Sequence, residues 1–264
     1  MGDQIPQEWY GEKLRDGAAS VEQCTTLKAY FDHILRVDDA ARILTKPVHE
    51  AATATQDRTE DEVEELCNLW GIIIDLIIEW QIAHPQILRL LYAIARLPRV
   101  DRTGKASLST FTDDAGVLRD CQLWEDLPSF WNLLSDYWYS YIAWRNTAVQ
   151  STGTPDTGDN EWTRTNAFAA LALVDEGPFK GMKLLSDWGR HALDLAAKGG
   201  AATAHIDVPA AVPWLVLAGP ELRKIHNQHE TEWRQAFEDI SKAENLDERL
   251  RDDAADMVAR LSET

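Results

Sequence analysis

The stretch that decides the fold is Asn160-Glu161-Trp162-Thr163-Arg164-Thr165-Asn166-Ala167-Phe168-Ala169-Ala170-Leu171-Ala172-Leu173. Helical spacing places five of its residues on one face: Trp162, Asn166, Ala169, Ala170 and Leu173. Small alanines let a neighbouring helix approach closely. The single amide must find partners, because an unpaired buried polar group costs ~1–3 kcal/mol. We therefore predict that this helix lies at the centre of the protein.

Helical periodicity continues along the chain, whereas strand-like alternation and hairpin signals are weak. Ser20 is a candidate N-cap, Thr59 with Glu62 resembles a capping box, and Gly199-Gly200 is a helix breaker. The sequence predicts an all-α protein: a single globular multi-helix domain of about nine or ten helices with no significant sheet. We expect residues 1–19 to be a loose leader, residues 20–264 to form the domain, and loops to lie near 99–120 and 146–160.

Composition limits the partners. Of the 264 residues, 45% are hydrophobic, which is enough to bury a core, and the net charge is −18. Such an acidic surface repels a phosphate backbone and anionic lipid. The longest apolar run, residues 69–83, contains Asp75 and Glu79 and is shorter than the ~20 residues that span a bilayer. We predict no nucleic-acid partner and no membrane partner.

Cysteine usage indicates a reducing compartment. Cys24, Cys67 and Cys121 stand alone, without the paired spacing of a disulfide framework or a zinc site. Residues 1–6 have neither the basic nor the apolar region of a signal peptide. We predict a cytoplasmic location.

Eleven tryptophans are the unusual feature of the composition. Each can bury ~150–250 Å² and still offer an N–H. Tryptophans spread through helices either anchor packing or line a pocket for a flat ligand, and the sequence leaves both interpretations open.

Several segments, in this order, resemble a fungal family of helical proteins known only as a domain of unknown function. They are Leu69-Trp70 with Pro85–Leu91, Trp124–Pro128, Trp162 with Asn166–Leu171, Arg190–Asp194, Val208–Trp214 with Ala218-Gly219, and Glu232-Trp233 with Phe237. Thr165, Gly189 and Pro213 depart from the family's pattern. The resemblance spans about residues 60–260 and implies a helical fold and no agreed activity, so it assigns no catalytic residue. Because some relatives lie beside secondary-metabolite genes, it also implies a link to secondary metabolism.

The residues themselves suggest one candidate for catalysis. His191 lies on an apolar stripe near Trp188, and Asp187 stands one turn earlier, where a carboxylate can orient a general base. The candidates for lining a pocket are Trp162, Asn166, Arg190 and Trp214. Each has a structural alternative: His191 as a satisfied core histidine, and Asn166 as a clasp between helices.

Two acidic or histidine-rich patterns suggest metal binding. Asp252-Asp253-Ala254-Ala255-Asp256 spells the DDxxD pattern of helical terpene cyclases, but no second metal motif follows it, so a solvated acidic helix is the better interpretation. His226, His229 and Glu230 have helical spacing, but they fall at a predicted helix break. We predict no metal and no cofactor.

Two functions fit the sequence. The first is binding of a small apolar or aromatic molecule in an internal aromatic-lined pocket, with a metal-independent isomerase- or cyclase-like step as one form. The second is a non-enzymatic interaction or scaffold protein with a solid core. A cavity beside Asn166, Arg190 and His191 favours the first, and a filled core there favours the second.

Overall fold

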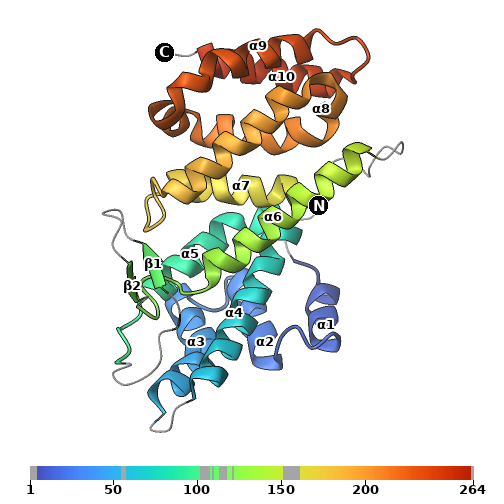
Figure 1. The fold of residues 1–264 in the computed structure, drawn as a ribbon. Helices are drawn as coiled ribbons and strands as arrows, with labels where there is room; N and C mark the ends of the chain where they lie inside the picture. Colours follow the sequence, from blue (N-terminus) through green and yellow to red (C-terminus); the bar gives the residue numbers. More distant parts are fainter. Residues whose placement is uncertain are drawn as a thin grey trace. The chain divides into compact units, whose positions relative to one another are not determined.

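The structure is a computed structural model that describes residues 5–54, 58–101, 108, 110–112, 118–120, 122–150 and 161–262, the side chains of 110–112, 118–120 and 146–150 excepted. These residues contain ten α-helices and one antiparallel pair of three-residue strands, β1 (Thr110–Thr112) and β2 (Leu118–Asp120) (Figure 1). The predicted all-α class is confirmed.

Contacts divide the chain into two compact units, Met1–Tyr137 and Trp138–Thr264. Helix α6 (Phe130–Gln150) contributes its first part to one unit and the rest to the other. The single domain that we expected over residues 20–264 stays a prediction.

The first unit is built on a buried helix. Its elements are α1 (Gln7–Arg15), α2 (Val21–Phe31), α3 (Val37–Thr53), α4 (Thr59–Glu79), the 3-10 turn η1 (Gln81–Ala83), α5 (His84–Ala95), the two strands and the start of α6. Helix α3 packs against α4 and α5. The isoleucines of α4 are fully buried, and Trp70 donates its indole N–H to the carbonyl of Pro128 at 2.7 Å. Burial of an isoleucine-rich face stabilises this unit by the hydrophobic effect.

The N-terminal segment is more ordered than predicted. Residues 7–15 form α1 rather than a loose leader, and Trp9 and Tyr10 are buried. Lys13 lies 2.7 Å from both Asp75 and Glu79 of α4, and the indole N–H of Trp9 also donates to Glu79. The two charges inside the isoleucine run therefore bind this helix and are not simply a solvated edge.

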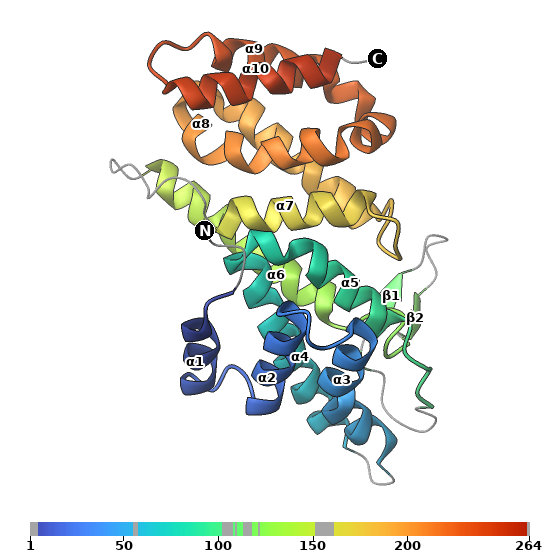
Figure 2. The same ribbon diagram turned by 180° about the vertical axis from the view of Figure 1, so that it is seen from behind.

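The second unit holds the segment on which the sequence analysis centres. It comprises the rest of α6, α7 (Glu161–Val174), α8 (Lys183–His226), the 3-10 turn η2 (Asn227–His229), α9 (Glu230–Ser241) and α10 (Glu248–Ser262). Helix α7 packs along α8, and α9 and α10 lie side by side against α8 (Figures 1 and 2). The predicted burial of its face is confirmed for Trp162, Asn166 and Ala169.

Several predicted boundaries differ from the structure. The break expected at Gly199-Gly200 is present, because two helical segments, both labelled α8, meet at a kink at Gly200, whose φ of 53° and ψ of −146° are not helical. Thr59 is the first residue of α4 rather than its cap, while Ser20 does cap α2 in a capping box. Residues 146–150 continue α6 instead of starting a loop, and the loop predicted over 151–160 lies outside the described residues.

By length and composition alone, the stretch Lys183–Ser241 is apolar enough to cross a membrane, as is the bent pair Thr59–Glu79 with Gln81–Ala95. In the first stretch, 56% of the most apolar window is buried inside the protein. The core helices of proteins that do not enter a membrane have the same character. The absence of a membrane partner stays a prediction.

Candidate functional site

The carboxamide of Asn166 joins three helices of the second unit. Its oxygen accepts a hydrogen bond from the indole N–H of Trp214 on α8 at 2.8 Å and a longer one, 3.4 Å, from Trp138 on α6. Its amide nitrogen donates to the backbone carbonyl of Trp162, one turn earlier on α7, at 2.8 Å. Both ends of the carboxamide are therefore engaged within the protein, as expected of a clasp between helices.

Four tryptophans surround this clasp. The ring of Trp138 stacks on Trp188, with centroids 5.0 Å apart and planes 6° apart, and lies 5.2 Å from Trp162. Together with Trp214, these tryptophans are at most 2% exposed. We call Trp138, Trp162, Trp188 and Trp214 the indole cluster.

Close packing continues on the far side of Trp214. A Cβ placed on Gly189 of α8 would lie 2.7 Å from Trp214 Cε3 and 2.9 Å from Leu222 Cδ2. Only a glycine permits this approach, which explains why glycine stands where the family resemblance led us to expect a larger residue. Side chains therefore leave no room for a methyl group at Gly189.

His191 lies against this cluster, with its ring centroid 5.5 Å from that of Trp138. Its Nε2 atom is buried and has no hydrogen-bond partner among the residues that the structure describes. Burial, followed by the positive charge of Arg190, lowers the pKa of His191 below its usual 6.5, so the ring is neutral at pH 7. The general-base role stays a prediction.

Asp187 does not orient His191. Within the described residues no hydrogen bond or ion pair joins the two, and the negative charge of Asp187 acts instead on His226. A spacing of four residues places two side chains on one helical face but does not make them meet.

Arg190 belongs to a polar seam between α8 and α9. It lies 3.2 Å from Asp194, whose other oxygen accepts the indole N–H of Trp233 at 2.8 Å. The ring of His229 stacks on Trp233, and its Nδ1 is 4.0 Å from Asp194. The Asp194–Trp233 bond fastens α9 to the first part of α8.

The sequence analysis missed a buried ion pair. Arg145 of α6 meets Asp207 of α8 with two bonds of 2.6 Å, and Asp207 is 1% exposed. Thr203 donates its hydroxyl to the same carboxylate, and a Cβ on Gly199 would collide with Thr203. The one available sequence signal was a lone aspartate between Ile206 and Val208, in a segment predicted to precede a helix.

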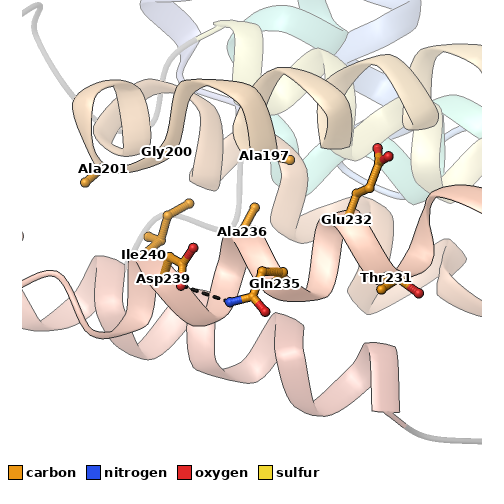
Figure 3. A pocket seen from close by; sticks show the side chains of 9 residues that line it. All are labelled: Ala197, Gly200, Ala201, Thr231, Glu232, Gln235, Ala236, Asp239 and Ile240. Carbon is orange, nitrogen blue, oxygen red and sulfur yellow. Dashed lines mark hydrogen bonds between the residues drawn. The ribbon is translucent and has the colours of Figure 1, made fainter.

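A groove of about 560 Å³ lies between α8 and α9 (Figure 3). Helix α8 lines it with Ala197, Gly200 and Ala201, and α9 lines it with Thr231, Glu232, Gln235, Ala236, Asp239 and Ile240. The α8 side of the groove consists of small residues. The two charged groups that line the groove, Glu232 and Asp239, are both carboxylates. None of the pocket residues predicted from the sequence lines this groove.

The two metal-binding patterns do not assemble into a site. Asp252 and Asp256 are exposed on α10, and Asp256 pairs with Arg260 at 2.7 Å. In the part of the chain that the structure describes, no three His, Cys, Asp or Glu side chains gather where they could hold a metal ion.

The fold and this site define a class: an all-helical protein whose interior is clasped by tryptophans and whose described surface carries an acidic groove. The chain belongs to DUF3632, a family of proteins of unknown function, whose model matches residues 70–259. No curated protein and no solved structure matches the chain.

Proposed function

We propose that this protein is a non-enzymatic interaction module, in which the indole cluster is structural and the α8–α9 groove receives the partner. The observation that carries this proposal is Asn166. Its oxygen and nitrogen are both used by Trp214, Trp138 and Trp162, so the amide has little to offer a ligand.

The groove is a second observation that supports the proposal. It has a volume of about 560 Å³ and is lined by residues of both helices. Its small residues allow close approach of a partner's backbone or side chains. The thiols of Cys24 and Cys67 are free, which supports a partner in the cytoplasm.

Selection from a displayed library of helical peptides, with the full chain as target, tests this function. We expect the enriched peptides to lose binding to an Ala236→Trp variant, whose indole fills the groove. The matched control is Ala255→Trp, at an exposed position on α10, and it should bind like the parent. Peptides that bind both variants equally, or no enrichment at all, would contradict the proposal.

A second candidate is a small-molecule protein of fungal secondary metabolism, and it has its own supporting observation. Within the described part of the chain, the buried Nε1 atoms of Trp162 and Trp188 and the Nε2 of His191 lack hydrogen-bond partners, and all three rings contact Trp138. Three unsatisfied polar atoms around one ring are what a small polar-tipped ligand would satisfy.

Thermal-shift measurements with fractionated metabolite extracts separate the two candidates. Stabilisation that disappears in His191→Phe but persists in Ala236→Trp would favour the small-molecule function. The interaction proposal predicts no stabilisation that depends on His191.

A further inference from the structure

We propose that the α8–α9 groove binds a basic amphipathic helix of another protein, with cationic side chains seven residues apart. This inference rests on the interaction function proposed above and adds the chemistry of the partner.

The charge of the groove points to a cationic partner. Glu232 and Asp239 are both exposed at its rim, and neither forms an ion pair with a lysine or arginine among the described residues. Gln235, between them on α9, donates its amide N–H to Asp239 at 3.0 Å and holds that carboxylate in place (Figure 3). Opposite charge on the partner gives orientation and a faster encounter.

The floor of the groove points to a helix. Ala197 and Ala201 on α8 face Ala236 and Ile240 on α9, so the apolar surface between the two helices consists mostly of alanine (Figure 3). An amphipathic helix binds such a surface with apolar anchors at i, i+3 or i+4, and i+7.

The two carboxylates of the groove set the spacing of the partner's charges. Glu232 and Asp239 are seven residues apart on α9, which is ~10.5 Å at 1.5 Å per residue. Lysines or arginines seven residues apart on a helix lying along α9 match that spacing.

A second copy of this chain fits less well. The chain carries a net charge of −18, and the rim of the groove is negative as well, so self-association through this face brings like charges together.

Fluorescence anisotropy with a designed peptide tests the inference on the full chain. The probe is a labelled helical peptide with leucine anchors and two lysines seven residues apart, and its partner probe has glutamates at those two positions. We expect the lysine peptide to bind, and the Glu232→Lys, Asp239→Lys double variant to bind it about tenfold or more weakly. The double variant should in turn bind the glutamate peptide more tightly than the parent does.

The control is the double variant Glu244→Lys, Asp252→Lys, which makes the same change in net charge at exposed positions outside the groove. It should change affinity by about twofold or less, in the range of a screened surface charge. Equal weakening in both double variants would overturn the inference, because the attraction would then be to the whole acidic chain.

Two other outcomes also overturn it and bear differently on the function. If the lysine peptide does not bind but library-selected peptides of other composition depend on Ala236, the interaction function stands and the basic partner is wrong. If sedimentation shows a dimer of the parent that the Glu232→Lys, Asp239→Lys variant dissolves, the occupant of the groove is a second copy.

Discussion

The indole cluster and the α8–α9 groove use the same long helix in opposite ways. Around Asn166 the side chains are large and buried, and the amide has partners at both ends. Along the groove the side chains are small, the volume is open, and the charged groups lack ion-pair partners within the described residues.

This difference teaches where function should be sought in a tryptophan-rich helical protein. Burial of an aromatic ring is a strong stabilising contribution, so tryptophans gather where the fold needs rigidity. Rim charges without ion-pair partners among the described residues contribute little to stability, and the proposed function assigns them to binding. If this division is right, substitutions in the interior change stability and substitutions in the groove change only binding.

The largest effect should come from the buried ion pair beside the bend of α8. Asp207→Ala leaves the Arg145 guanidinium buried without its carboxylate and should lower the free energy of unfolding by about 3–5 kcal/mol. Urea denaturation measures the loss. The double variant Arg145→Met, Asp207→Leu should recover most of it, and failure to recover would mean that Asp207 acts through something other than this pair.

Removing the clasp should cost somewhat less. Asn166→Ala leaves the indole N–H of Trp214 buried without an acceptor, and we expect a loss of about 1–3 kcal/mol in the free energy of unfolding. Asn245→Ala, at an exposed position after α9, is the matched control and should stay within about 0.5 kcal/mol. Equal stability of the two variants would show that the amide contributes nothing to the interior.

Substitution of two glycines on α8 by alanine compares a tightly packed position with an open one. Gly189→Ala forces a methyl group against Trp214 and Leu222 and should destabilise the protein by about 1–3 kcal/mol. The new methyl group of Gly219→Ala meets no described atom within 4 Å and should stabilise the helix by about 0.5–1 kcal/mol. Thermal unfolding of both variants measures the difference, and effects of the same sign would contradict the packing described.

The neutral histidines add a smaller effect that depends on pH. Burial lowers the pKa values of His191 and His226 below 6.5 in the folded state, so the unfolded chain binds more protons near that pH. Stability should therefore fall as the pH drops below about 6.5, toward the folded pKa values. His191→Gln should reduce this slope in denaturation curves between pH 7.5 and 5.5, and an unchanged slope would mean that His191 does not contribute to it.

The groove should be the least sensitive region. Glu232→Gln and Asp239→Asn remove its two rim charges and should change the free energy of unfolding by no more than about 0.5 kcal/mol. Denaturation of each variant beside Asn166→Ala measures the contrast. A loss as large as that of the clasp variant would place these carboxylates among the structural groups.

The features that could be predicted from the sequence depend on residues close together in the chain. The period of α7 identified Trp162 and Asn166 as buried on one face, and the clasp was one of the two interpretations given for the amide. The Gly199-Gly200 breaker appears as the kink at Gly200, where two helical segments meet. Capping at Ser20 was predictable because its partner is three residues away.

The features that could not be predicted depend on contacts between residues far apart in the sequence. Arg145 and Asp207 are 62 positions apart, and Lys13 lies more than 60 positions from Asp75 and Glu79. Nothing in the local spacing indicates such partners. The groove depends likewise on how α8 and α9 pack, and its small and acidic residues looked like ordinary surface positions in the sequence.

Hydrogen exchange of the indole N–H groups, followed by NMR on the ¹⁵N-labelled protein, tests the central claim most directly. Trp214 donates to Asn166 inside the cluster, whereas Trp144 is 40% exposed and serves as the internal reference. We predict that the Trp214 indole proton exchanges only through global unfolding, and that the Trp144 proton exchanges rapidly. Comparable rapid exchange at Trp214 and Trp144 would show that water reaches the clasp and that the interior around Asn166 is open.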